Sequence, residues 1–148
     1  MIIGSISENK DLEKRISITP DIAKKYIDNG FQVLLEENYG NHLGISDDEF
    51  LSAGCKIEKK ETILKNSEIN LQLNLPEEKN LELFKENKIL IGSFHTSQNL
   101  EKIAKFKSKN ISIFSLDLLP RITRAQSMDI LSSQANLAGY KAVVDSFA

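Results

Sequence analysis

The stretch Lys88-Ile89-Leu90-Ile91-Gly92-Ser93-Phe94 decides the fold, because it is a short apolar run between two helical patterns. A run of this length and composition is typical of a buried strand. Residues 98–107 then predict a helix, and residues 111–116 predict another short strand. This order of strand, helix and strand predicts a parallel sheet that is covered by helices on both faces.

The same alternation continues toward the N-terminus, where helix boundaries are well marked. Thr19 and Pro20 are an N-cap and a first helical residue, and the pair Asn29-Gly30 ends that helix. Ser46 and Glu49 form a capping box that opens a second helix. Strands are expected at 1–5, 31–35, 55–57, 68–73, 88–94 and 111–116, with further helices at 61–66 and 79–86. We therefore predict a three-layer α/β fold, Rossmann-like or flavodoxin-like, with a mostly parallel sheet.

The pattern changes after Pro120. Thr123 and Gln126 have capping-box spacing and predict a long helix that runs to Ala148 without a helix-stop residue. Its apolar residues recur at spacings of three and four, namely Met128, Leu131, Ala135, Ala138 and Ala142. We therefore divide the chain into an α/β domain, residues 1–122, and a linking helix, residues 123–148, and expect the chain to stop within an element.

Composition limits the possible functions. The chain has 148 residues, of which 41% are hydrophobic, which suffices for one core. Its net charge of −2 gives no electrostatic case for binding nucleic acid. A lone cysteine, Cys55, is expected to be a small buried filler, and it fits a cytoplasmic location. No cluster of His, Cys, Asp or Glu has the spacing of metal ligands, so we expect no metal.

A stripe of polar residues follows one side of the expected final helix. It consists of Asp129, Ser132, Ser133, Asn136 and Tyr140. Solvated helix faces in this chain carry Lys and Glu, whereas this stripe is uncharged apart from Asp129. Small hydroxyl and amide groups suit hydrogen bonding to a planar polar ligand. The alternative interpretation is that the stripe packs against neighbouring backbone.

Two arginines precede the stripe. The guanidinium groups of Arg121 and Arg124 suit carboxamide, phosphate or carboxylate oxygens. Two cations at a helix N-terminus oppose its dipole, which hints at a ligand role. The alternatives are that both are ordinary surface arginines and that Gln126 is only the second member of the capping box.

The run from Leu119 to Tyr140, LPRITRAQSMDILSSQANLAGY, closely resembles the signature segment of proton-translocating NAD(P) transhydrogenase alpha subunits. Residues 13–20 and 30–36 are similar to both transhydrogenases and alanine dehydrogenases. The resemblance covers essentially the whole chain.

This resemblance implies that hydride passes from NADH, held by this subunit, to NADP⁺ on a separate domain, coupled to proton translocation. Four residues would surround the nicotinamide and serve catalysis: Arg121, Gln126, Asp129 and Ser132. Asp129 and Ser132 would hold the carboxamide, Arg121 would steady the nicotinamide end, and Gln126 would face the NADP(H) site. Ser133 and Tyr140 are further candidates for cofactor binding.

The resemblance also implies partners. The family's Rossmann NAD-binding domain carries a glycine-rich fingerprint, and no G-x-G-x-x-G occurs here. We therefore expect this chain alone to bind NAD(H) weakly or not at all and to be inactive. The implied partners are that missing domain, the NADP(H)-binding domain and the membrane subunit, which would place the chain in the cytoplasm, peripheral to the inner membrane. An exposed apolar patch would favour a homodimer.

Two alternatives stay open. In alanine dehydrogenases an Arg, a Lys and a His hold the keto acid. Arg15 and His95 match two of these, but Gln72 stands at the Lys position and has no charge for a carboxylate. The chain could instead be a non-catalytic interaction half-domain.

Overall fold

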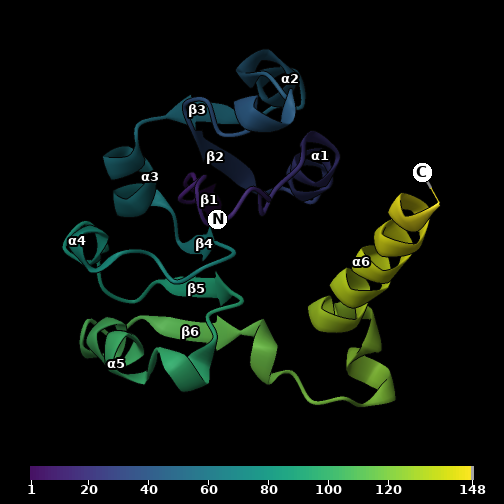
Figure 1. Ribbon diagram of the computed structural model, residues 1–148. Coiled ribbons are helices and arrows are strands. Elements are labelled where there is room, and N and C mark those ends of the chain that lie inside the picture. The colour runs from purple at the N-terminus through teal and green to yellow at the C-terminus, as the bar shows by residue number, and fades with distance from the viewer. Residues whose placement is uncertain (148) are drawn as a thin grey trace.

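The computed structural model describes residues 1–147, and its centre is a single sheet of six parallel strands (Figure 1). The strands are β1 (Ile2–Ser5), β2 (Gln32–Glu36), β3 (Lys56–Glu58), β4 (Ile69–Leu71), β5 (Ile89–Gly92) and β6 (Ser112–Ser115). All five neighbouring pairs run parallel. The predicted α/β fold is therefore confirmed.

The strand order is β3-β2-β1-β4-β5-β6. This is the order of dinucleotide-binding Rossmann domains, whereas flavodoxin-like sheets follow the order 2-1-3-4-5. The sequence left the order open, because it depends on which strands pair across long stretches of chain. The order reverses between β1 and β4, and such a reversal creates a crevice at the carboxyl ends of these strands.

Helices cover both faces of the sheet. They are α1 (Pro20–Asp28), α2 (Asp47–Ser52), α3 (Lys60–Asn66), α4 (Glu78–Leu81) and α5 (Leu100–Ser108). Helices α1 and α2 enclose an apolar cluster of Ile3, Ile18, Ala23, Val33, Leu35, Tyr39, Phe50 and Cys55. Helices α3 to α5 lie over a second cluster of Ile6, Leu34, Ile63, Leu64, Phe84, Leu90, Phe94, Phe106 and Ile111. Two apolar layers thus hold the sheet between the helices.

The marked helix boundaries behave as the sequence predicts. Helix α1 begins at Pro20 after Thr19, and Gly30 follows its end with a φ of 86°, where glycine carries no steric penalty. At the start of α2, the carboxylate of Glu49 accepts the backbone N–H of Ser46 at 2.9 Å. The predicted capping box is therefore confirmed.

The helix predicted at residues 79–86 is shorter than expected. Helix α4 ends at Leu81. The backbone hydrogen bonds that follow span only three residues, from the Leu83 N–H to the Asn80 carbonyl and from the Phe84 N–H to the Leu81 carbonyl. Phe84 is buried and packs edge-on against Phe106 of α5, with ring centroids 5.7 Å apart. This tertiary contact is better served by a turn than by continued helix.

The final helix, α6 (Ile130–Ser146), starts later than predicted. Residues Thr123–Met128 form a 3-10 helix instead, and Asp129 is the N-cap of α6. The Thr123–Gln126 capping box is therefore wrong as the start of the long helix. Asp129 provides the cap because its carboxylate accepts the N–H of Ser132. Ala148, the last residue of the predicted helix, lies outside the described residues.

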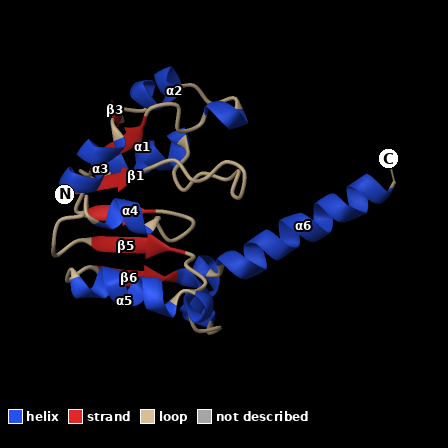
Figure 2. Cartoon of the chain, turned by 60° about the vertical axis from the view of Figure 1, so that its left-hand side comes forward, coloured by secondary structure: helices blue, strands red, loops and turns tan. Residues whose placement is uncertain are grey.

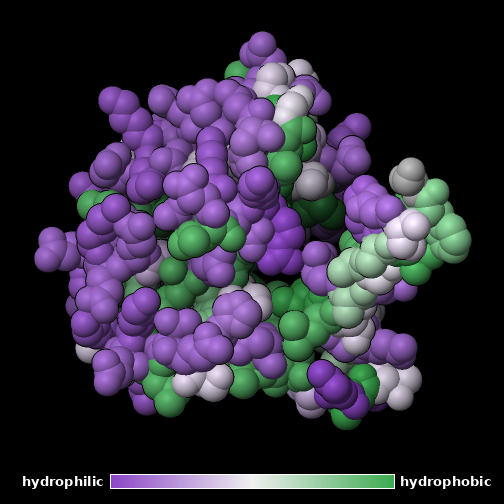
Figure 3. All heavy atoms as spheres, in the orientation of Figure 1, coloured by the Kyte–Doolittle hydropathy of each residue, from purple (hydrophilic) through white to green (hydrophobic). Residues whose placement is uncertain are grey.

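Helix α6 extends away from the sheet and its covering helices (Figure 2). None of its residues is buried, including the predicted apolar face. In Figure 3 its surface is mostly pale green and white, beside a body whose visible surface is largely hydrophilic. Within residues 1–147, no helix is both long enough and apolar enough to cross a membrane.

Candidate functional site

Asp129 is the organising residue of the segment that the sequence singled out. One oxygen of its carboxylate accepts the Ser132 N–H at 3.0 Å, and the other accepts the Ser132 hydroxyl at 2.6 Å. The hydroxyl of Ser133 donates to the backbone carbonyl of Asp129 at 3.0 Å. The two serines and the aspartate therefore form one hydrogen-bonded group at the start of α6.

The charge of this group is well defined. The Ser132 hydroxyl, followed by the backbone N–H groups, lowers the pKa of Asp129 below its usual value. Arg121 adds a smaller electrostatic attraction that lowers this pKa further. The group thus presents a carboxylate and two hydroxyls at an open surface, because none of these residues is buried.

The remaining predicted residues are not gathered there. Gln126 contributes its backbone carbonyl, which accepts the Asp129 N–H at 3.3 Å, while its side chain is exposed. Tyr140 is 72% exposed and lies eight residues beyond Ser132, about 12 Å along the helix axis. The structure therefore joins Asp129, Ser132 and Ser133 through hydrogen bonds. Within residues 1–147 no hydrogen bond or ion pair connects the side chains of Arg121, Gln126 or Tyr140 to this group.

A separate cleft of 430 Å³ opens at the carboxyl ends of β1, β4 and β5. It lies at the switch point of the strand order, where open α/β sheets bind ligands. Its lining includes Glu8 and Glu13 after β1, Gln72 and Asn74 after β4, and His95 after β5. No residue from Arg121 to Tyr140 lines this cleft.

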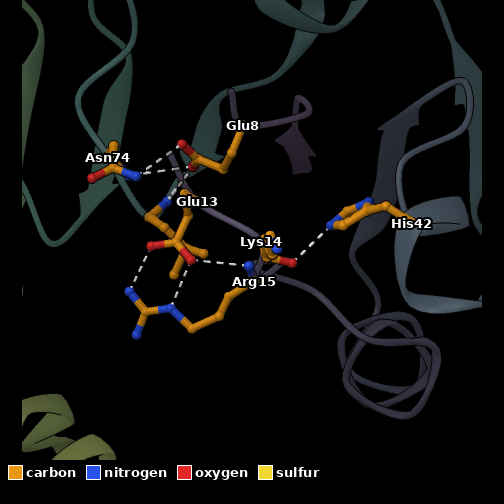
Figure 4. A network of polar contacts seen from close by, with 7 residues as sticks. Glu8, Glu13, Lys14, Arg15, His42 and Asn74 are labelled. Atoms are coloured by element: carbon orange, nitrogen blue, oxygen red, sulfur yellow. Dashed lines mark hydrogen bonds and ion pairs between the residues drawn. The ribbon is translucent and has the colours of Figure 1, made fainter. Parts of the chain in front are cut away.

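Glu8 connects two walls of the cleft (Figure 4). Its carboxylate accepts the N–H of Leu73 at 2.7 Å and the N–H and side-chain amide of Asn74 at 3.2 Å each. Burial raises the pKa of Glu8, and these three donors oppose the rise. Glu8 thereby ties the loop after β1 to the loop after β4.

Glu13 and Arg15 form a bidentate pair at the mouth of the cleft (Figure 4). The two carboxylate oxygens accept from the guanidinium at 2.9 and 2.7 Å, and Arg15 lowers the pKa of Glu13. The Arg15 side chain is therefore already occupied by an internal carboxylate. Nearby, the His42 ring contacts the Lys14 carbonyl at 2.7 Å, so this exposed histidine is also a hydrogen-bonded loop residue.

His95 sits on the opposite wall in a left-handed conformation, with a φ of 46°. The carboxylate of Asp117 accepts the flanking N–H groups, Phe94 at 3.1 Å and Thr96 at 3.0 Å. Burial pushes the pKa of Asp117 up, but its donors, led by the Ser115 hydroxyl, bring it below its usual value. A non-glycine residue in this conformation needs such support from its surroundings.

Sequence reasoning did not single out Glu8 or Asp117. Each is an isolated acid in a loop, and its partners are distant in the chain, as Glu8 and Leu73 are separated by 65 positions. The one available signal is position, because each follows a predicted strand at the edge where the carboxyl ends meet. Cys55, by contrast, is buried as predicted, and burial raises the pKa of its thiol to about 11.

The strand order and the cleft at its switch point define an α/β domain of the kind found in dinucleotide-dependent enzymes. Residues 4–138 match the family described as "Alanine dehydrogenase/PNT, N-terminal domain". The chain belongs to this family.

Individual relatives distinguish the two branches of the family. The chain is 35% identical to "NAD(P) transhydrogenase subunit alpha" of Haemophilus influenzae, covering 98% of this chain and 28% of that protein. It is 25% identical to "Alanine dehydrogenase 1" of Staphylococcus aureus, over 97% of this chain and 38% of that protein. A crystal structure of transhydrogenase from Sinorhizobium meliloti superposes with a TM-score of 0.91 at 33% identity, covering 98% of this chain and 43% of that one. The chain thus resembles the N-terminal part of transhydrogenase alpha subunits and spans less than half of their length.

Proposed function

We propose that this chain is part of the NAD(H)-side subunit of a transhydrogenase, and that another part of the subunit binds the phosphates of the dinucleotide. In this chain the nicotinamide would be oriented by four residues, Arg121, Gln126, Asp129 and Ser132. Hydride would pass from NADH to NADP⁺ on a partner domain, coupled to proton translocation. The observation that carries the proposal is the Asp129–Ser132 pair, which presents ionised oxygens at an open surface.

The residues fit a carboxamide, which has one acceptor oxygen and two donor hydrogens. The Asp129 carboxylate can accept from the amide nitrogen, and the Arg121 guanidinium can donate to the carbonyl. The Ser132 hydroxyl now donates to Asp129 at 2.6 Å, so it would turn to donate to the carbonyl oxygen instead. Ser133 and Tyr140 would make further contacts only after the partner domain closes over α6.

The bound nicotinamides supply the hydride chemistry, and the protein supplies position and electrostatics. This segment would fix the ring's orientation, so that one face of its C4 points at the partner ring at about 3–3.5 Å. Exclusion of water from that gap depends on other domains, because this segment is open to solvent on its own.

The partners in this proposal are a Rossmann NAD-binding domain, an NADP(H)-binding domain and a membrane subunit. The chain lacks a glycine-rich dinucleotide fingerprint, so we expect it to bind NADH weakly or not at all by itself. The proposal places the chain in the cytoplasm, peripheral to the inner membrane, and includes a homodimer.

A chimera tests this function. This chain replaces the matching residues of the Haemophilus influenzae subunit, and reduction of an NADP⁺ analogue by NADH is measured in the assembled enzyme. Asp129→Asn retains a good helix cap, so we expect normal folding and a rate at least about tenfold lower. Asp145→Asn, an exposed aspartate further along α6, is the matched control. An Asp129→Asn chimera as fast as its parent would refute the assignment.

The second candidate is a non-catalytic interaction half-domain, and the complete exposure of α6 favours it. If the chimera assembles with normal affinity but shows no hydride transfer, this alternative gains support.

A further inference from the structure

We propose that the cleft at the carboxyl ends of β1, β4 and β5 binds a small uncharged carboxamide, and that Gln72 recognises it. This inference goes beyond the proposed function, because the cleft shares no residue with the Arg121–Tyr140 segment.

The first argument is an unsatisfied buried donor. Gln72 lines the cleft and is only 4% exposed, yet among the described residues its amide nitrogen Nε2 has no hydrogen-bond partner. Buried polar atoms in native proteins are almost always hydrogen-bonded. Because Gln72 lines the cleft, a small rotation of its side chain would bring this nitrogen to a ligand that carries an acceptor oxygen.

The second argument is the arrangement of amide side chains along and beyond β4. Asn70 lies in β4, Gln72 directly follows the end of this strand, and Asn74 lies in the bend beyond it. Asn74 is held by Glu8, with its Nδ2 3.2 Å from the carboxylate. Of these three residues, only Gln72 and Asn74 line the cleft. Because Glu8 already holds the amide of Asn74, Gln72 has the amide that remains for a ligand.

The third argument is charge. The charged side chains that line the cleft are three glutamates, three lysines and His95: Glu8, Glu13, Glu77, Lys60, Lys79, Lys102 and His95. Two of the carboxylates have found partners within the chain, since Glu13 pairs with Arg15 and Glu77 with Lys79. The acidic and lysine charges balance, and Arg15 is not free for a carboxylate. An anion would also have to approach Glu8 and Glu13, so an uncharged carbonyl compound is favoured over a keto acid.

The fourth argument is the match between Gln72 and an amide ligand. A primary amide presents a donor and an acceptor in one plane, so two amides can pair through two parallel hydrogen bonds. The ring of Phe94 and the side chain of Leu75 supply apolar wall beside Gln72. Aromatic carboxamides therefore fit best, since a ring can pack against Phe94 while the amide meets Gln72.

The test is an NMR titration of the 148-residue chain with nicotinamide and, separately, with nicotinate, which has the same ring and a carboxylate in place of the amide. We expect nicotinamide to shift the Gln72 side-chain amide and the His95 backbone signals in a saturable manner. Nicotinate should bind at least about tenfold more weakly. Shifts confined to residues 121–140 would assign the amide to the segment of the proposed function and would overturn the cleft proposal.

Variants complete the test. Gln72→Leu should abolish the saturable shift at His95, and Gln72→Lys should reverse the preference in favour of nicotinate. Gln98→Leu, which removes an exposed amide outside the cleft, should bind nicotinamide as the parent chain does. Equal affinities for nicotinamide and nicotinate, undiminished binding by Gln72→Leu, or no saturable shift at about 10 mM nicotinamide would each overturn the proposal.

Discussion

The ammonium group of Lys88 donates to the backbone carbonyl of Ser67 at 2.6 Å, at the point where α3 ends and β4 approaches. It also donates to the Leu64 carbonyl at 2.6 Å, so a lysine that directly precedes β5 caps the C-terminus of α3. Cations near helix C-termini are favourable, and they satisfy carbonyls that lack intrahelical partners. The contact fixes α3 against the sheet, but it requires a charged group that is only 5% exposed.

Lys88 should make the free energy of unfolding change with pH in the alkaline range. Burial, assisted by Lys85 and opposed by Glu68, lowers the pKa of Lys88 from 10.5 to about 8. Between these values the unfolded chain binds more protons than the folded chain, so the free energy of unfolding rises with pH. We expect a rise of about 1–2 kcal/mol, because the two carbonyls partly retain the charge. Urea unfolding at about pH 7.5 and about pH 9.5 measures it.

The control for this effect is Lys88→Met, which should be less stable than the parent because two helix carbonyls lose their donor. The difference between parent and variant should grow with pH through the window. A difference that stays constant would show that Lys88 does not titrate there.

Tyr39 should contribute strongly to stability through its hydroxyl. The buried oxygen accepts the N–H groups of Ser17 at 3.0 Å and Ile18 at 3.3 Å, and lies 2.8 Å from the Ser5 hydroxyl. Tyr39→Phe leaves these donors without an acceptor, which should cost about 2–3 kcal/mol in unfolding free energy. Denaturant unfolding measures the loss. Tyr26→Phe on the half-buried side of α1 should change stability little, and equal losses in both variants would contradict this role.

Local patterns explain why much of the fold was predictable. The run around Leu90 and the boundary at Thr19-Pro20 each carry their information within a few residues, so the strand and the helix start were recognisable. The order of the strands depends on pairing between distant segments, and no local pattern encodes it. The start of α6 was misplaced because Thr123 and Asp129 are both good caps. Residues Thr123–Met128 form a 3-10 helix in which Ala125 is buried, and the long helix begins only after Asp129.

The candidate site was predictable in part for the same reason. The Asp129–Ser132 contact spans three residues and follows from helical spacing. Glu8 and Asp117 act through the loops after β4 and β5, which approach them only when the sheet has formed. Their roles therefore require the tertiary structure.

Asp129 should control the stability of the first turn of α6. Its carboxylate caps the helix, and its pKa lies below its usual value of 3.8. A carboxyl group with a lowered pKa stabilises the folded form when ionised, so the contribution is lost as pH falls below about 4. Asp129→Ala should make the backbone amide of Ser132 exchange with solvent faster, whereas Asp129→Asn should retain most of the protection. Hydrogen exchange followed by NMR measures this, and unchanged exchange in Asp129→Ala would exclude the cap.

Phe114 should promote self-association of the isolated chain. It lies on the edge strand β6 and is 56% exposed. Among the described residues, the apolar cluster enclosed by α1 and α2 does not extend to this strand. The following residues Leu118 and Ile122 are also exposed, which extends the apolar surface toward α6. Apolar patches of this kind mark interfaces.

Phe114→Glu should therefore shift the chain toward monomer in sedimentation equilibrium, because a carboxylate is costly to bury in an apolar contact. Leu51→Glu, which alters a similarly exposed apolar residue on α2, is the matched control and should leave the monomer fraction unchanged. If both variants shift the equilibrium equally, net charge and not this surface controls association.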